Sequence, residues 1–280
     1  MPEQSRVSVP ADDRGLAYGD GLFETMAVVF GRVRLLDHHL DRLCSDAARL
    51  SLPIDRPALE STVQQRARVL DHGVLKLLLT RGSGPRGYAI PPTVTPRRLF
   101  LETCQAAGFA DTWCNAPQAP IAVRVCDTPL SVNPVLAGMK HLNRLPQVLA
   151  RSEWTGGEVT EGLMRAAGEA IVCATSANVF ALRGDSLVTP ALEQAGVAGV
   201  MRRALLEVAR DEGVAVAYED LTLDTLRHRA DAVMLSSSLT GVRQVGSIDG
   251  EALRLGSADV DGRIERLRRA LGQRIGVPNA

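Results

Sequence analysis

The clearest shortage in this 280-residue sequence is lysine. Of its 32 lysine and arginine residues only Lys76 and Lys140 are lysines, and the remaining 30 are arginines. A guanidinium keeps its proton in proteins, whereas a partly buried amine can lose its proton and act as a nucleophile or base. Any reaction that needs a neutral side-chain amine therefore has two candidates in this chain.

Net charge, long apolar runs and paired cysteines are also missing. Basic and acidic residues number 32 each, so no excess charge favours nucleic acid or an anionic membrane as a partner. No apolar run reaches the roughly 20 residues that a membrane-spanning helix needs, and no signal peptide is expected at the start. The five cysteines form no Cys-x-x-Cys pair, which is typical of reduced thiols. These absences predict a cytoplasmic protein that acts on a small molecule or another protein.

Motifs for metals and nucleotides are absent or incomplete. The sequence has no His-Glu-x-x-His stretch, so no metal site is expected. The glycines of residues 81–88 have the spacing of a dinucleotide fingerprint, but two consecutive prolines just downstream prevent the helix that this fingerprint requires. Two interpretations of this loop remain: a solvated turn, or a loop carrying Arg81, Arg86 and Tyr88 that presents a guanidinium and a phenol to a carboxylate.

The pattern of apolar residues predicts an α/β (α+β) chain of two lobes. We expect a small N-terminal α/β domain over residues 1–110, an interdomain linker over 111–119 and a larger C-terminal domain over 120–280. The elements predicted for the first domain are a hairpin over 23–36, helices over 37–53 and 57–71, and strands over 74–81 and 98–103. Those predicted for the second are strands over 121–126, 162–165 and 170–182, helices over 142–153, 200–212 and 261–271, and short strands over 214–218, 232–236 and 242–248.

Lys140 is the better candidate for amine chemistry. It follows a glycine and precedes a predicted helix, whereas Lys76 lies inside an apolar strand, where an edge-strand or pairing role is natural. A lysine in a chain that otherwise uses arginine suggests an amine that forms a Schiff base. The start of the helix at 200–212 and the serines of residues 236–240 offer N–H groups and hydroxyls to a phosphate. Together these features suggest pyridoxal phosphate as the cofactor.

Six motifs in the same order resemble those of the fold-type IV pyridoxal-phosphate enzymes and, within that class, the aminodeoxychorismate lyases. They lie at residues 18–25 (YGDGLFET), 39–43 (HLDRL), 81–88 (RGSGPRGY), 140–144 (KHLNR), 176–180 (SANVF) and 189–202 (TPALEQAGVAGVMR). The resemblance implies a small N-terminal α/β lobe and a larger C-terminal pseudo-barrel lobe. It also implies a homodimer with an active site between the lobes, near the subunit interface.

The same resemblance implies roles for individual residues. Lys140 is expected to carry the cofactor and to act as the catalytic base, and Thr25 to be the second catalytic residue. Further cofactor contacts are implied at Arg42, Val200, Met201 and Ser238, and contacts to substrate carboxylates at Arg86 and Tyr88. The implied reaction converts 4-amino-4-deoxychorismate into 4-aminobenzoate and pyruvate in folate biosynthesis. A D-amino-acid or branched-chain aminotransferase on the same fold, and a cofactor-binding protein without activity, are the alternatives.

One position departs from the family pattern. Members of the family usually have a glutamate that pairs with the pyridine nitrogen five residues before the asparagine of the SANVF-like motif, and Cys173 stands there in this chain. Glu169 lies four residues earlier, which is about 13 Å along a strand, so it cannot simply substitute. A thiol would hold a protonated ring more weakly, which would impair transamination more than an aromatising lyase reaction. Our hypothesis is that Cys173 still contacts the cofactor and favours the lyase.

Overall fold

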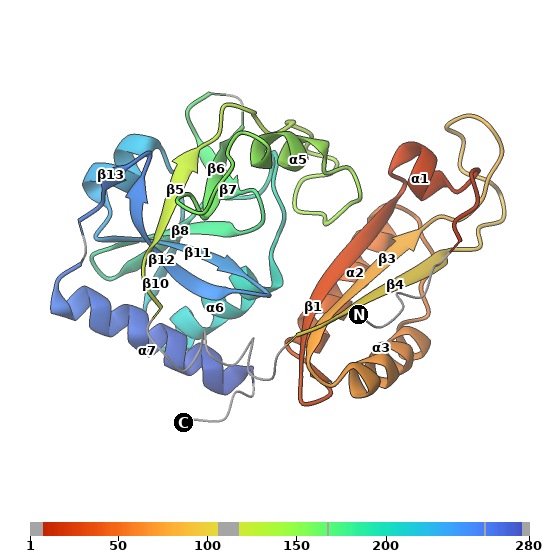
Figure 1. Ribbon diagram of the computed structural model, residues 1–280, viewed down its shortest axis with the longest axis horizontal. Coiled ribbons are helices and arrows are strands. Elements are labelled where there is room, and N and C mark those ends of the chain that lie inside the picture. The colour runs from red at the N-terminus through yellow and green to blue at the C-terminus, as the bar shows by residue number, and fades with distance from the viewer. Residues whose placement is uncertain (1–7, 106–117, 167, 255, 276–280) are drawn as a thin grey trace. The chain divides into compact units, whose positions relative to one another are not determined.

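The computed structural model describes residues 8–105, 118–166, 168–254 and 256–275 (Figure 1). The chain divides into two compact units, Met1–Ala106 with Lys140–Asn143 and Ala107–Met139 with Arg144–Ala280. Most of the linker expected at 111–119 lies outside the described residues. We placed Lys140 in the larger domain, but Lys140–Asn143 belong to the first unit.

The first unit is an antiparallel sheet with helices packed against one face (Figure 1). The strand order is β2-β1-β3-β4, with β1 at Gly21–Val29, β2 at Arg32–Val33, β3 at Gly73–Thr80 and β4 at Arg97–Cys104. The helices are α1 at Arg14–Tyr18, α2 at Leu36–Arg49 and α3 at Arg56–Leu70. The hairpin, the two longer helices and the two later strands of the prediction are confirmed.

Local chemistry sets the ends of the two longer helices. The Asp55 side chain accepts a hydrogen bond from the Ala58 N–H at 3.0 Å, which caps the start of α3. We expected Asp37 to cap α2, but Leu35 is the capping residue, in a left-handed conformation, and Asp37 lies in the first turn. There its charge still favours the helix N-terminus. The apolar stripes of both helices pack on the sheet as expected, and the buried core they form contains Leu40, Leu43, Ala47, Leu59, Val63, Ala67 and Leu70.

The second unit is a nine-stranded sheet that closes on itself. Its strand order is β10-β9-β8-β11-β12-β5-β6-β7, with β13 added to β12, and β7 also pairs with β8. The six strands from β8 to β7 therefore form a closed, barrel-like ring, which confirms the expected pseudo-barrel. The strands are β5 at Ile121–Val125, β6 at Glu161–Arg165, β7 at Ile171–Ala174, β8 at Asn178–Arg183, β9 at Ser186–Thr189, β10 at Ala215–Tyr218, β11 at Ala232–Ser237, β12 at Gly241–Ile248 and β13 at Glu251–Ala252. The helices are α5 at Leu145–Arg151, α6 at Val200–Asp211, a short π-helix at Thr225–Arg229 and α7 at Ala258–Arg274.

Two predicted elements of the second unit are wrong in extent. The strand expected over 170–182 is a hairpin of β7 and β8, because the hydroxyls of Thr175 and Ser176 both donate to the buried Glu161 carboxylate and turn the chain. The helix expected over 142–153 is the shorter α5, because a proline occupies its first turn. In a single strand Cys173 and Asn178 would lie five residues apart along the chain. In the hairpin they lie opposite each other on neighbouring strands.

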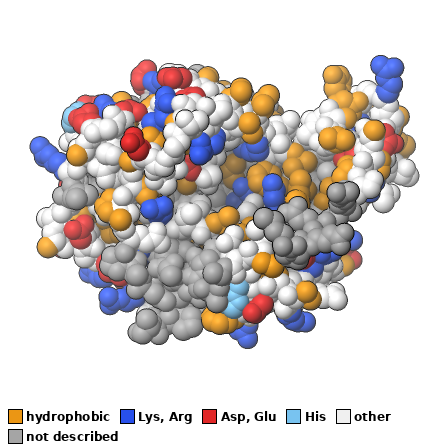
Figure 2. Space-filling model, viewed as in Figure 1, with side chains coloured by type: hydrophobic (Ala, Val, Ile, Leu, Met, Phe, Trp, Pro, Cys, Tyr) orange, Lys and Arg blue, Asp and Glu red, His pale blue; other side chains and the backbone are white. Residues whose placement is uncertain are grey.

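The surface agrees with the balanced composition. On the face shown in Figure 2, basic and acidic side chains are interspersed. Within the described ranges, no helix is long and apolar enough to cross a membrane.

Candidate active site

Lys140 is held by backbone contacts along the first half of β1, where β2, which pairs only with Val28 and Val29, leaves the edge of the strand uncovered. The Phe23 N–H donates to the Lys140 carbonyl at 3.0 Å, and the Leu142 N–H donates to the Gly21 carbonyl at 3.0 Å. From the other side, the Lys140 N–H donates to Oδ2 of Asp46 on α2 at 3.0 Å. The segment of Lys140 therefore extends the sheet of the first unit by a short antiparallel bridge.

Both lysines of the chain lie beside one aromatic ring. The Lys140 Nζ is 4.1 Å from the centroid of the Phe23 ring, and the Lys76 Nζ is 5.3 Å from the same centroid. Lys76 pairs with Thr25 across β1 and β3, and β3 is an interior strand, so the edge-strand interpretation of Lys76 is wrong. Because alternate residues of a strand point to the same face, Phe23, Thr25 and Lys76 share the sheet face that bears Lys140.

A buried charged cluster lies on the opposite, core-facing side of β1. The carboxylate of Glu24 contacts His39 Nδ1 at 2.7 Å and Arg42 Nε at 2.8 Å, and a second Arg42 nitrogen, Nη2, also donates to it. Burial alone would raise the pKa of Glu24, but the charge of Arg42, with a smaller contribution from His39, lowers this pKa to about 2. Burial also lowers the pKa of His39. Glu24 is therefore ionised at neutral pH, and His39 is neutral and donates its Nδ1 proton to the carboxylate.

This cluster fixes the plane of the Arg42 guanidinium, whose role as a phosphate ligand stays a prediction. Glu24 and His39 were not among the residues expected to have a function. The signal was present, because a glutamate between Phe23 and Thr25 in an apolar strand needs a cationic partner when it is buried.

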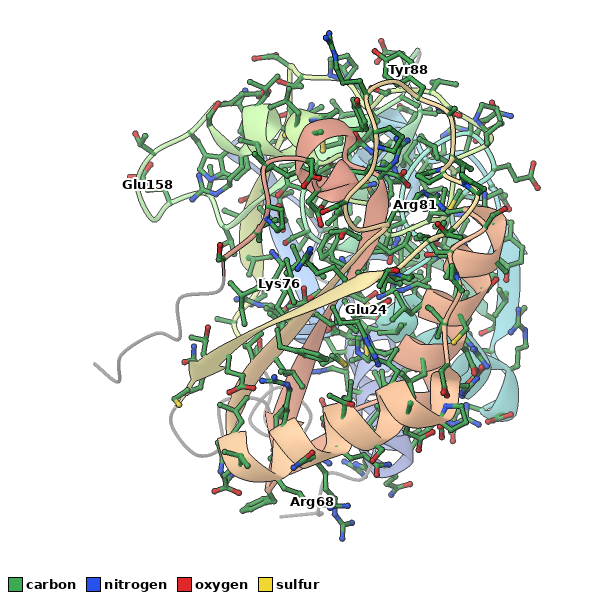
Figure 3. The ribbon with its side chains drawn as sticks, turned by 90° about the vertical axis from the view of Figure 1, so that its right-hand side faces the viewer. Glu24, Arg68, Lys76, Arg81, Tyr88 and Glu158 are labelled. Carbon is green, nitrogen blue, oxygen red and sulfur yellow. The ribbon has the colours of Figure 1, made fainter. Side chains whose placement is uncertain are left out.

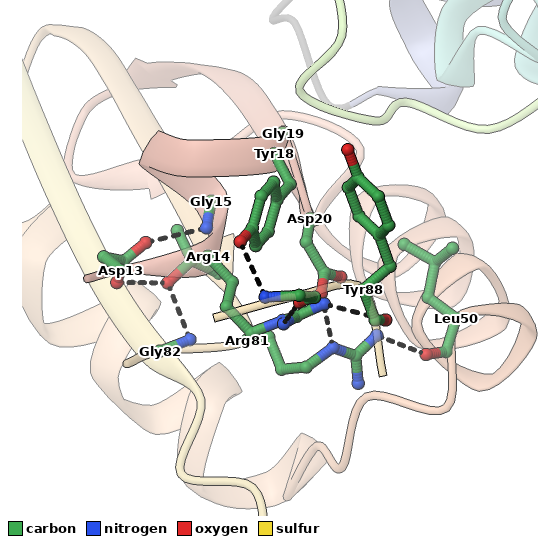
Figure 4. Close-up of polar contacts among 12 residues, drawn as sticks. Asp13, Arg14, Gly15, Tyr18, Gly19, Asp20, Leu50, Arg81, Gly82 and Tyr88 are labelled. Atoms are coloured by element: carbon green, nitrogen blue, oxygen red, sulfur yellow. Dashed lines mark hydrogen bonds and ion pairs between the residues drawn. The ribbon is translucent and has the colours of Figure 1, made fainter. Parts of the chain in front are cut away.

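The loop of residues 81–88 contains one buried arginine and one exposed arginine. Arg81 is buried, and its guanidinium donates to Asp20 Oδ2 at 2.7 Å, to the Leu50 carbonyl at 2.7 Å and to the Ser51 carbonyl at 3.2 Å (Figure 4). Arg86 is exposed, and the side chain of Tyr88 is 86% exposed. Arg81 thus supports the loop, and Arg86 is the arginine of this loop that a ligand can reach.

In the second unit a row of polar side chains crosses three strands. Cys173 on β7 is opposite Asn178 on β8, which is in turn opposite Ser236 on β11. Directly opposed residues of antiparallel strands lie on one face, so these three are neighbours. Burial raises the pKa of Cys173 to about 12, and the charge of Arg144 opposes this rise. Ser236 is buried, and its Oγ has no hydrogen-bond partner within the described part of the chain.

The start of α6 approaches this row closely. The Asn178 Nδ2 donates to the Val197 carbonyl at 2.8 Å, and a Cβ on Gly199 would lie 2.1 Å from Asn178 Oδ1. Only glycine therefore permits this approach at the N-cap of α6. Val200 and Met201 follow in the first turn, where helix N–H groups have no partner within the helix.

Ser238 lies in the turn that follows β11. This turn is shaped by Ser237, whose Oγ contacts the Thr240 Oγ1 at 2.7 Å and accepts from the Thr240 N–H at 3.1 Å. The second unit thus brings Cys173 near the start of α6 through Asn178, and it places Ser238 two residues beyond Ser236. Among the residues described, no group of three or more histidine, cysteine, aspartate or glutamate side chains could hold a metal ion.

Comparisons with known proteins agree with the six motifs. A sequence profile of the family "amino-transferase class IV" matches residues 21–248. The chain is 33% identical over 242 residues to an aminodeoxychorismate lyase of Vibrio harveyi, covering 86% of this chain and 87% of the relative. It is 28% identical over 257 residues to a D-alanine aminotransferase of Listeria monocytogenes, covering 89% of this chain and 86% of the relative.

A solved structure of a lyase is also similar to this chain. The crystal structure of 4-amino-4-deoxychorismate lyase from Pseudomonas aeruginosa superposes with a TM-score of 0.87 at 38% identity, covering 98% of this chain and 97% of that one. The resemblance inferred from the sequence motifs is confirmed, together with the two-lobed α/β fold that it implied. The chain belongs to the class IV aminotransferase family.

Proposed function

We propose that this protein is a pyridoxal-phosphate-dependent lyase that converts 4-amino-4-deoxychorismate into 4-aminobenzoate and pyruvate. The observation that carries the proposal is the similarity to two lyases over nearly the whole chain, at 33% and 38% identity. Identity to the D-alanine aminotransferase, over a similar length, is 28%. The face of the small sheet adds support, because it carries an anchored lysine and the Thr25 hydroxyl together.

The residues present suit pyridoxal phosphate. The buried Oγ of Ser236, which has no partner among the described residues, is a feature that a bound polar group would explain, and the first turn of α6 offers N–H groups that have no partner within the helix. We assign the covalent attachment to Lys140 and the phosphate to Arg42, Val200, Met201 and Ser238. When bound, pyridoxal phosphate supplies a conjugated system that withdraws electrons from the carbon bearing the substrate amine.

The chain's own residues then have three tasks. The Lys140 amine removes the proton from the ring carbon that bears the substrate amine, a step that needs this lysine neutral. As the ring becomes aromatic, the C–O bond to the enolpyruvyl group breaks, and the Thr25 hydroxyl delivers a proton to the departing group, which becomes pyruvate. Arg86 and Tyr88 bind substrate carboxylates.

Cys173 supports this lyase reaction over transamination. With its pKa raised to about 12, the thiol is neutral at physiological pH and offers the pyridine nitrogen no counter-charge. Aromatisation of the substrate ring provides a driving force that transamination lacks, so we propose that the lyase tolerates Cys173 where an aminotransferase would not.

We further propose a cytoplasmic homodimer with the active site near the subunit interface. The four cysteines among the described residues are free, as suits a reducing compartment. The short helix α5 exposes three large apolar side chains, Leu145 at 66%, Val148 at 61% and Leu149 at 51%, and hydrophobic side chains are visible over α5 in Figure 2. Such a patch is typical of an interface.

The test is turnover by the purified, cofactor-loaded protein. With enzymatically made 4-amino-4-deoxychorismate, we expect 4-aminobenzoate and pyruvate in equal amounts, and no 4-aminobenzoate from Lys140→Ala. Borohydride reduction followed by peptide mapping should label Lys140 and leave Lys76 unlabelled. Consumption of a keto acid with D-alanine, without release of 4-aminobenzoate, would show an aminotransferase instead. A label on Lys76 would overturn the assignment of the attachment site.

A further inference from the structure

We propose that Arg14 is a positioning residue for the substrate, because its buried guanidinium clamps the loop that carries Arg86 and Tyr88. The inference rests on the proposed function for the role of this loop. Arg14 was not among the residues that the sequence singled out for function. Its contacts all lie within the first unit (Figure 4).

The Arg14 side chain makes directed bonds to three different residues. Its Nε donates to Asp20 Oδ2 at 3.0 Å, its Nη1 to the Gly87 carbonyl at 2.9 Å and its Nη2 to the Tyr88 carbonyl at 3.3 Å. The two carbonyls directly follow Arg86 and lie at the tip of an otherwise exposed loop. A planar guanidinium with five donors suits this arrangement, and a lysine ammonium at the same place could not reach all three acceptors.

The Arg14 guanidinium also lies against Tyr18, whose ring contacts the ring of Tyr88 at the loop tip. It lies 5.0 Å from the centroid of the Tyr18 ring, and the ring centroids of Tyr18 and Tyr88 are 5.4 Å apart in an edge-to-face arrangement. The Tyr18 hydroxyl accepts a hydrogen bond from the Gly87 N–H at 3.3 Å. Gly87 is therefore held through both its N–H and its carbonyl, on the residue between Arg86 and Tyr88.

Asp20, the residue to which Arg14 connects the loop, is itself held in place. Asp20 accepts bonds from both Arg14 and Arg81, and Arg81 is tied in turn to the carbonyls of Leu50 and Ser51. Although burial opposes it, the two arginines hold the pKa of Asp20 below its usual range, so the carboxylate stays ionised. Arg14 thus connects the loop tip to a fixed anchor in the folded unit.

The sheet does not depend on this clamp. β3 and β4 pair continuously from Gly73 with Cys104 to Thr80 with Arg97, so their hairpin is set by eight residue pairs outside the loop. Removing the Arg14 contacts should therefore free the loop tip and leave the sheet intact. We expect the consequence in substrate binding, through Arg86 and Tyr88, and little consequence for the chemical step at Lys140.

Kinetic analysis of a double-mutant cycle tests the role in binding. We expect Arg14→Gln to raise KM for 4-amino-4-deoxychorismate about tenfold, roughly the cost of losing one charge-assisted hydrogen bond, with kcat changed by less than about twofold. If Arg14 acts through Arg86, the double variant with Arg86→Gln should be no worse than Arg86→Gln alone. Arg14→Lys should not restore KM. The exposed Arg68→Gln, which removes the same charge from α3 (Figure 3), is the matched control and should behave as wild type.

Hydrogen exchange on the same holoenzymes separates this inference from the proposed function. Amides of Gly84 and of residues 86–89 should exchange faster in Arg14→Gln, and amides of β3 and β4 should not change. An unchanged loop, a full rescue by Arg14→Lys or additive losses in the cycle would each overturn the role of Arg14. If the wild type releases no 4-aminobenzoate, the proposed reaction is overturned, whatever the exchange of the loop. Faster exchange of the loop in Arg14→Gln would then still support the clamp, and KM would be compared with D-alanine as the substrate.

Discussion

Glu24 is a carboxylate that is almost completely buried in the first unit. A carboxylate taken out of water is stable only when it is paired, and Glu24 has two partners on α2. Arg42 neutralises the charge, and His39 completes the hydrogen bonding. This cluster ties the middle of β1 to α2, and the neighbouring residues Phe23 and Thr25 are positioned on the opposite face by the same strand.

The Glu24 cluster predicts that stability falls in acid. Because the pKa of Glu24 is about 2 in the folded protein and 4.5 in the reference state, its contribution of about 3 kcal/mol is complete above pH 4.5 and is lost as pH falls towards 2. His39 acts in the same direction below pH 6.5, because its lowered pKa makes the unfolded chain bind its proton more readily. Urea unfolding at several pH values measures this loss.

The comparison that isolates Glu24 uses Glu24→Gln. We expect this variant to be less stable than wild type at pH 7, and the difference to shrink between pH 4.5 and pH 3. Glu158→Gln, at an exposed position, removes the same charge and should follow the wild-type curve. A difference between wild type and Glu24→Gln that stays constant with pH would contradict the assigned cause.

At the residue scale, the role of Lys140 stays a prediction that rests on the scarcity of lysine, and geometry explains which contacts the sequence could not indicate. The scarcity of lysine singled out Lys140, but nothing local shows that Lys76 shares the Phe23 ring, because only strand register and the insertion of Lys140 at the edge of β1 bring the two together. Arg14 was missed for a similar reason. Its acceptors at Gly87 and Tyr88 are more than seventy residues away in sequence.

Among the elements, helix α6 depends on one glycine. The backbone angles of Gly199, φ −63° and ψ 142°, are ordinary for any residue, so glycine is not required for conformation. It is required for space, because the nearest atom to a Cβ would be the Asn178 Oδ1 at 2.1 Å. Asn178 cannot easily yield, since its Nδ2 is bonded to the Val197 carbonyl.

We therefore predict that Gly199→Ala weakens cofactor binding. The added methyl group must displace either Asn178 or the first turn of α6, which costs about 1–3 kcal/mol and moves the N–H groups of Val200 and Met201. Titration of the apoprotein with pyridoxal phosphate, followed by absorbance, should give an affinity at least about tenfold lower. Gly157→Ala, where nothing lies within 4 Å of the new methyl group, is the control. Unaltered affinity in Gly199→Ala would show that the start of α6 does not hold the phosphate.

Elements whose ends are set by neighbouring residues were predicted correctly, and elements shaped by residues far away in the sequence were not. Helix α3 was predicted well because its cap and its apolar stripe are local signals. The β7–β8 hairpin was predicted as one strand because its turn depends on Glu161, a carboxylate from another strand. Hydrogen bonds from a distant residue leave no periodic pattern in the segment that they bend.

At the scale of the whole molecule, the pattern of apolar residues indicated two lobes, and the motifs identified the family. The boundary was harder to predict, because Lys140–Asn143 join the first unit although the residues on both sides belong to the second. The backbone bonds of Lys140 and Leu142 to β1 cause this crossing. Such pairing joins segments more than one hundred residues apart, which no local pattern of apolar residues can show.

The exposed apolar face of α5 leads to a prediction about the oligomeric state of the protein. If Leu145, Val148 and Leu149 lie in the dimer interface, Val148→Glu places a charge in an apolar contact, where it cannot be hydrated. In an isolated chain the same exposed substitution changes stability by only about 0.5 kcal/mol. We therefore expect sedimentation equilibrium to give twice the chain mass for wild type and the mass of one chain for Val148→Glu, with folding retained by circular dichroism. Val69→Glu on α3, also at an exposed valine, should remain dimeric. A monomeric wild type would rule out the homodimer, and a dimeric Val148→Glu would move its interface away from α5.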